Sequence, residues 1–155
     1  MTKQTTISKT VSLSGVGIHT GKKVKLTFKP APVNHGYAFS RVDLEGTPVI
    51  KADANLVVNT SRGTNLEKNG VSIQTSEHVL AALVGLEIDN ILIELNESEP
   101  PIMDGSSIHF VEALLEAGIE EQDAERYEYV VRENISFADE AVSYTHLTLP
   151  TIFRV

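Results

Sequence analysis

Residues 71–95 read VSIQTSEHVLAALVGLEIDNILIEL, and the spacing of apolar residues changes twice within this stretch. From position 75 the apolar residues follow the spacing of one helix face, which predicts a helix that buries Val79, Ala82, Leu83 and Leu86. Thr75 or Ser76 is suited to be its N-cap. After a turn at Asp89-Asn90, residues 91–95 are apolar enough to form a central strand. The stretch therefore predicts a helix that packs on a sheet.

Upstream of this stretch the sequence predicts strands. The apolar residues near the start all have odd numbers, which would place them on the same face of one half-buried strand: Ile7, Val11 and Leu13. Apolar side chains at 24, 26 and 28 alternate with three lysines and a threonine in residues 23–29, and two prolines follow them. Further strands are predicted at 37–42 and 56–58. The Asn69-Gly70 pair between residues 64–66 and 71–73 is a strong hairpin signal.

Downstream, a second helix is predicted after the turn at residues 104–107. Phe110, Val111, Leu114 and Leu115 are spaced for burial on one face, and Gly118 is a suitable C-terminal stop. The order of many strands, helix, strand and helix predicts the α+β class. We expect a two-layer sandwich, with one mostly antiparallel sheet and two helices on one face.

The composition changes after residue 119. The acidic run at residues 120–125 is interpreted as a linker, and the apolar residues from 127 onward as the start of a new strand. We therefore predict an N-terminal domain at 1–125 and the start of a truncated second domain at 126–140. Residues 141–155, AVSYTHLTLPTIFRV, differ in character and are interpreted as a non-native tail, which the functional reasoning leaves out.

The overall composition excludes several functional classes. The chain has 155 residues and no cysteine, which rules out thiolate catalysis and cysteine-held metals. It shows no apolar run long enough for a transmembrane segment and no secretory signal, which favours a cytoplasmic location. A net charge of −8 argues against nucleic acid as a partner.

The charge is distributed unevenly along the chain. Most of the 13 basic residues lie before position 69, and most of the 21 acidic residues lie after it. The basic half is compatible with a small anionic ligand, or equally with an ordinary solvated face.

Glu77 and His78 fall in the first turn of the first predicted helix. The helix dipole there favours an ionised carboxylate and a neutral imidazole. That pair suits metal-assisted hydrolysis, with Glu77 as a base and His78 as a ligand. The alternative is an acidic first turn with an incidental histidine, since position 82, where a zincin helix has its second histidine, is Ala82.

His19 lies in a loop rich in glycine. An imidazole held there beside a basic strand is able to bind a phosphate or a developing charge. The same residues also fit an ordinary tight turn.

Four segments together resemble one enzyme family. They are SGVGIHTGK at 14–22, TSEHVLAAL at 75–83, GLEIDN at 85–90 and PIMDGS at 101–106. In order and spacing they are similar to the UDP-3-O-acyl-N-acetylglucosamine deacetylases, which are zinc amidases of lipid A biosynthesis. The resemblance covers about residues 1–137. NHG at 34–36 and TSRGT at 60–64 resemble forms fused to a 3-hydroxyacyl-carrier-protein dehydratase.

The resemblance implies a role for several residues. Glu77 matches the general base, and His78 matches one ligand of the Zn²⁺ cofactor. His19 matches a residue near the polar end of the substrate, and Ser61 and Arg62 belong to a segment that borders the substrate site. Asp104 is expected to be the N-cap of the second helix.

The resemblance also implies that the chain is the first of two similar domains with the active site between them. The other zinc ligands would belong to the second domain and are absent from this chain, so we expect the fragment to be inactive alone. The implied reaction hydrolyses the N-acetyl group of a UDP-linked acylated glucosamine to the amine and acetate. The alternative is a non-enzymatic RNA- or protein-binding module of the same two-layer architecture.

Overall fold

The structure is a computed structural model that describes residues 2–130, 132, 137–139, 142–144 and 152–154. The chain forms two compact units. One is Lys3–Ala124, and the other consists of Met1–Thr2 and Glu125–Val155. Within the described residues, no helix is both long and apolar enough to cross a membrane.

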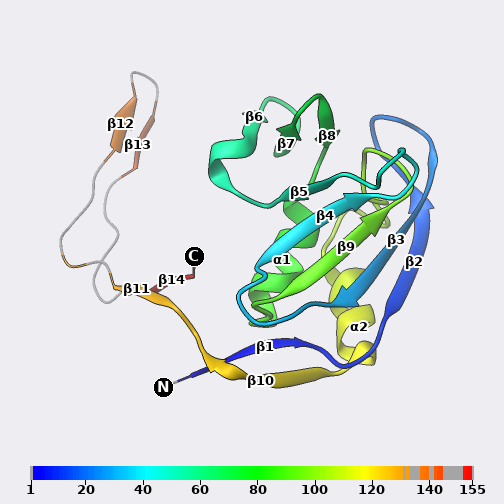
Figure 1. The fold of residues 1–155 in the computed structure, drawn as a ribbon. Coiled ribbons are helices and arrows are strands. Elements are labelled where there is room, and N and C mark those ends of the chain that lie inside the picture. Colours follow the sequence, from blue (N-terminus) through cyan, green and yellow to red (C-terminus); the bar gives the residue numbers. More distant parts are fainter. Residues whose placement is uncertain (1, 131, 133–136, 140–141, 145–151, 155) are drawn as a thin grey trace. The chain divides into compact units, whose positions relative to one another are not determined.

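The first unit is built on a five-stranded sheet in the order β2-β3-β9-β4-β5 (Figure 1). Its strands are β2 (Val11–Val16), β3 (Lys23–Pro30), β9 (Ile91–Leu95), β4 (Tyr37–Arg41) and β5 (Val49–Lys51). All neighbours are antiparallel except β4 and β9, which are parallel. The predicted central strand is confirmed, because β9 pairs on both sides and alternates buried with half-buried residues.

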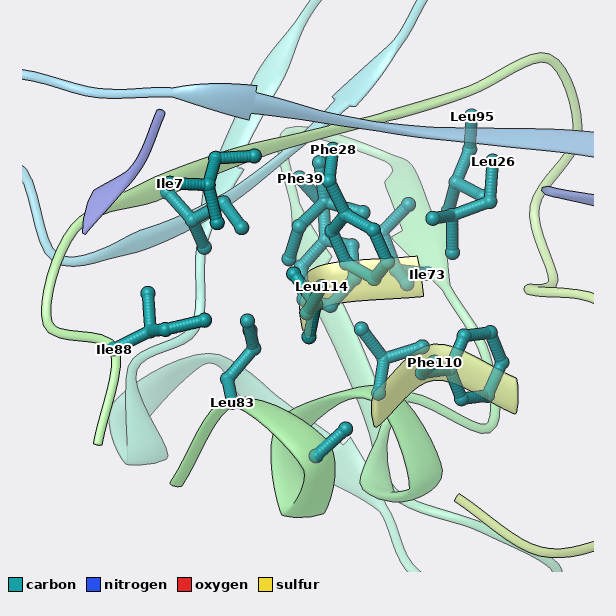
Figure 2. Packing of buried hydrophobic residues seen from close by; sticks show 14 of the residues in the cluster. Ile7, Leu26, Phe28, Phe39, Ile73, Leu83, Ile88, Leu95, Phe110 and Leu114 are labelled. Atoms are coloured by element: carbon teal, nitrogen blue, oxygen red, sulfur yellow. The ribbon is translucent and has the colours of Figure 1, made fainter. Parts of the chain in front are cut away.

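Two helices, α1 (Glu77–Gly85) and α2 (Ile108–Ala117), cover one face of this sheet (Figure 1). Their buried residues meet the inward side chains of β3, β4 and β9, and Figure 2 shows the resulting apolar layer between sheet and helices. Phe28 and Phe110 pack edge to face there, with ring centroids 6.4 Å apart. The α+β two-layer prediction is confirmed.

A smaller three-stranded sheet precedes α1. It consists of β6 (Val57–Asn59), which follows a 3₁₀ turn at Ala54–Leu56, and of β7 (Asn65–Lys68) and β8 (Val71–Ile73). Asn69 and Gly70 both adopt positive φ, 53° and 77°, as a tight two-residue hairpin with a type I′ turn requires. The hairpin prediction is confirmed.

Two predictions about strands were wrong. Ile7 and Val11 lie in separate strands, because β1 (Lys3–Ile7) ends before β2 begins. The acidic residues interpreted as a linker form a strand, β10 (Ile119–Glu125), which pairs with β1. Polar contacts hold it: Gln122 donates to the Ala31 carbonyl at 2.8 Å and accepts from Asn90 at 2.7 Å.

The helix caps also differ from the prediction for Asp104. The N-cap of α2 is Ser107, while Asp104 accepts from the backbone N–H and the hydroxyl of Ser106. Asp104 thus closes the turn that precedes the helix. Ser76 is the N-cap of α1, as one of the two predicted candidates, but its hydroxyl donates to the Thr64 carbonyl instead of capping the helix.

In the second unit, the described residues form two short antiparallel pairs. β11 (Glu128–Val130) pairs with β14 (Ile152–Arg154), and β12 (Phe137–Asp139) pairs with β13 (Val142–Tyr144). The new strand predicted after residue 126 corresponds to β11. Most of the tail predicted at 141–155 lies outside the described residues, and the domain boundaries stay predictions.

Candidate functional site

The start of α1 is held by an adjacent segment of chain. Glu77 Oε2 accepts the Thr64 N–H at 2.8 Å, and the Thr64 carbonyl accepts from both the N–H and the hydroxyl of Ser76. These bonds fix the first-turn carboxylate that the sequence singled out. They also lay residues 62–64 along the N-terminus of the helix.

Thr75 enters the helix through a strained conformation. Its φ is +52°, which is unusual for a β-branched residue and costs on the order of 1–3 kcal/mol. Asn65 Oδ1 accepts the Thr75 N–H at 3.2 Å, and the side chain of Thr75 is buried. Gly63 faces this turn, because a Cβ there would lie 3.2 Å from Thr75 Cα and from Glu77 Oε1. The turn therefore depends on a glycine opposite it.

His19 lies in the loop between β2 and β3 and reaches the same segment. Its Nε2 lies 3.2 Å from the Arg62 carbonyl, and since a carbonyl only accepts, Nε2 carries the proton. A cavity of about 270 Å³ opens beside this contact, lined by His19, Asn59, Ser61, Arg62, Asn65 and Gln74. The lining is entirely polar or charged, which suits a hydrogen-bonding ligand.

The structure thus brings together the three residues predicted to face the substrate, His19, Ser61 and Arg62. Glu77 and His78 do not line this cavity. They join it through the short stretch Arg62–Thr64, which contacts the His19 ring at one end and the Glu77 carboxylate at the other.

Reasoning from sequence missed the most deeply buried ionisable group of this region, Glu99. It is fully buried, and it accepts hydrogen bonds from His19, Thr20 and Thr75 at 2.9–3.2 Å. Burial alone would raise the pKa of Glu99. The bonds from the Thr20 N–H, the two threonine hydroxyls and the His19 N–H outweigh burial and hold the pKa below its usual value. In the sequence, Glu99 stands out only as the residue before Pro100-Pro101, which keeps the chain after β9 from continuing as a strand.

His78 is half-buried on the first turn of α1. Within the ranges that the structure describes, no three His, Asp or Glu side chains lie close enough to hold a metal together. A catalytic zinc site takes three protein ligands, so His78 supplies at most one of the set here.

Part of the uneven charge along the sequence is neutralised by ion pairs within the fold. Lys22 bonds Glu97 at 3.0 Å, Lys29 bonds Glu94 at 2.7 Å, and Lys3 bonds Asp123 at 2.8 Å. Each pair joins the basic first half of the chain to the acidic second half. These lysines support the solvated-face interpretation of the basic half, whereas Arg62 at the cavity remains compatible with an anionic ligand.

An α+β sandwich with a Glu-His pair at a helix start beside a polar cavity has the framework of an enzyme domain. Residues 4–152 match the sequence model of the family described as LpxC: UDP-3-O-acyl N-acetylglycosamine deacetylase, and the chain belongs to this family.

The chain is also similar to curated proteins. It is 48% identical over 150 residues to the bifunctional enzyme LpxC/FabZ of Bacteroides thetaiotaomicron, and the match covers 97% of this chain and 32% of that protein. The corresponding enzyme of Chlorobaculum tepidum is 49% identical over 147 residues, 95% of this chain and 32% of its own length. The UDP-3-O-acyl-N-acetylglucosamine deacetylase of Xanthomonas oryzae pv. oryzae is 47% identical over 139 residues, 90% of this chain and 46% of its own length. The chain therefore spans a third to just under half of these relatives.

Proposed function

We propose that the chain is the N-terminal part of a zinc-dependent deacetylase that acts in the cytoplasm. The substrate is UDP-3-O-acyl-N-acetylglucosamine, and hydrolysis of its N-acetyl group gives the free amine and acetate. The observation that carries this proposal is the family match over residues 4–152, together with Glu77 and His78 at the start of α1. The alternative of an RNA- or protein-binding module rests on architecture alone.

Glu77 acts as the general base. A carboxylate there can accept a proton from the attacking water and pass it to the departing amine nitrogen, so that water adds across the amide bond. The Thr64 N–H fixes one oxygen of the carboxylate, which keeps its direction constant. His19, Ser61 and Arg62 bind the polar end of the substrate in the cavity.

His78 is one ligand of the zinc ion. Zinc, when bound, would lower the pKa of a water molecule toward neutrality and polarise the carbonyl of the amide whose C–N bond is cleaved. The remaining ligands come from the part of the protein that follows this chain. The relatives named LpxC/FabZ suggest a dehydratase domain further downstream as an additional part of the same protein.

Two experiments test this function. In the full-length protein, Glu77→Ala lowers kcat by about 10²–10⁴-fold at unchanged zinc content. Glu67→Ala, which removes an exposed glutamate in the β7–β8 hairpin, leaves kcat unchanged. Near-normal turnover of the metal-replete Glu77 variant would exclude its role as base.

The second experiment uses the 155-residue chain alone. Its zinc affinity, measured by titration calorimetry, matches that of a single exposed histidine, and it releases no acetate from the UDP-sugar. His78→Ala leaves its stability unchanged, because no metal contributes to folding. Stoichiometric submicromolar zinc binding, lost in His78→Ala, would show that the chain completes a metal site by itself.

A further inference from the structure

Glu99 is a buried charge that the proposed reaction does not use. Its Oε2 accepts the Thr20 N–H at 2.9 Å and the Thr20 hydroxyl at 3.0 Å, and its Oε1 accepts the Thr75 hydroxyl at 3.0 Å. The His19 N–H points at both oxygens, at 3.1 and 3.2 Å. Four donors surround one carboxylate, which is how a protein keeps a buried carboxylate ionised.

The surrounding chain is shaped to admit this carboxylate. Gly17 is buried, and a Cβ there would overlap the Thr20 hydroxyl and lie 2.5 Å from Glu99 Oε2. Only a residue without a side chain leaves room for the carboxylate against the loop backbone. The loop is closed separately by backbone bonds from Gly17 to Lys22 and from Gly21 to Gly17.

Glu99 joins two parts of the candidate site that are far apart in sequence. On one side it holds the loop whose His19 ring donates to the Arg62 carbonyl at the cavity. On the other side it holds Thr75, whose positive φ sets the entry of the chain into α1, two residues before Glu77. The ends of β2 and of β9 and the start of α1 thus meet at one carboxylate.

We propose that Glu99 is a positioning residue: by binding the His19 loop and Thr75 at once, it fixes the His19 ring and the first turn of α1 relative to each other. The shape of the polar cavity follows from this bridge. The assignment rests on the proposed function only in naming what His19 serves. Its test reads the position of His19 directly and does not require catalysis.

The experiment compares Glu99→Gln with Glu97→Gln in the 155-residue chain. Glu97 is a matched control, because it is a glutamate two positions away that pairs with Lys22 near the surface. Amide hydrogen exchange reports the bonds to the loop, and nitrogen NMR of the His19 ring, assigned with His19→Gln, reports its tautomer.

In Glu99→Gln, one acceptor oxygen becomes an NH₂ group that faces N–H donors. We expect the His19 and Thr20 amides to exchange at least about tenfold faster, as loss of a hydrogen bond to a charged group implies. The Nε2–H tautomer of His19 loses its predominance. Exchange at Ile93 in β9 rises less, because the change is local. Glu97→Gln matches the wild type in all three measurements.

A second pair of variants covers the case in which Glu99→Gln does not fold. Thr75→Val removes the hydroxyl donor but keeps the branched shape, whereas Thr75→Ser keeps the donor. We expect Thr75→Val to speed exchange at His19 and Thr20 and to shift the His19 tautomer, because Glu99 connects Thr75 to both residues. Thr75→Ser should resemble the wild type.

Two results would overturn the proposal. The first is a folded Glu99→Gln whose His19 ring and amides match those of Glu97→Gln, or whose exchange rises equally at His19 and Ile93, which is the pattern of a merely stabilising residue. The second is a Thr75→Val variant that leaves the His19 loop unchanged. Neither result depends on whether the full-length protein deacetylates its substrate, so this proposal and the proposed function fail separately.

Discussion

Gly17→Ala adds a single methyl group at the point where the His19 loop meets Glu99. The backbone of Gly17 does not have the positive φ that favours glycine, so alanine can adopt its conformation. The difficulty is space, because the new Cβ would lie 2.5 Å from Glu99 Oε2 and closer still to the Thr20 hydroxyl. Either the carboxylate or the loop has to move, and the hydrogen bonds between them weaken.

The magnitude follows from two opposing effects. Overpacking of this kind costs about 1–3 kcal/mol, which is similar to the loss of one hydrogen bond to a charged group. Alanine also lowers the conformational entropy of the unfolded chain, which raises the free energy of unfolding by about 0.4–1 kcal/mol. We expect a net loss of about 1–2 kcal/mol in the free energy of unfolding. For a chain of this length, that loss lowers Tm by roughly 2–8 °C.

Gly85→Ala is the matched control. The same methyl group at Gly85 meets no atom within 4 Å, and the residue is exposed at the end of α1. We expect this variant to raise the free energy of unfolding by about 0.4–1 kcal/mol. Urea denaturation with an unchanged m-value measures both effects. A Gly17→Ala variant as stable as the wild type, or two variants that change stability in the same direction, would refute the steric account of the loop.

Three further predictions concern acid stability, the core and the C-terminal residues. Because the folded-state pKa of Glu99 is lowered, its stabilisation is present above the usual glutamate value of 4.5 and is lost as the pH falls through the folded pKa. The wild type should therefore lose more free energy of unfolding than Glu99→Gln between neutral and acid pH. Parallel plots of the free energy of unfolding against pH for the two proteins would contradict this. Leu83→Ala, at a fully buried site, should lower the free energy of unfolding by about 2–5 kcal/mol in urea denaturation, whereas Val84→Ala, half exposed on the same helix, should lower it by less than about 1 kcal/mol. Equal losses would argue against the assignment of Leu83 to the buried face of α1. Deletion of residues 141–155 should change Tm by less than about 2 °C, because the apolar core lies within Lys3–Ala124. A loss of several degrees would show that residues 141–155 stabilise the domain.

The parts of the fold that were predictable are those in which apolar spacing determines burial. The stripe through Val79, Ala82 and Leu83 packs as expected, and the mainly apolar run at 91–95 is the central strand. Strand β10 was missed because polar contacts stabilise it. Its residues are mostly exposed, and its anchor is Gln122, whose partners Ala31 and Asn90 are distant in sequence.

The candidate site shows the same division. Residue chemistry and the family resemblance pointed to Glu77 and His78, and the resemblance also pointed to His19, Ser61 and Arg62. No local pattern marks Glu99 as a buried charge, since its donors in His19 and Thr20 lie about 80 residues earlier, its donor in Thr75 lies 24 residues earlier, and its environment exists only when Gly17 approaches it. Its pairing depends on tertiary structure that a linear sequence does not display.

The position of β9 affects how the chain folds. β2 and β3 are close in sequence and can pair early, but β3 and β4 gain their shared neighbour only when residues 91–95 are available. Pairing over such separations costs loop-closure entropy and slows folding. During synthesis, a nascent chain that has not yet reached position 95 carries two strands with open edges, which are prone to pair with other chains. The interval before β9 pairs with β3 and β4 is therefore one in which the nascent chain is prone to aggregate.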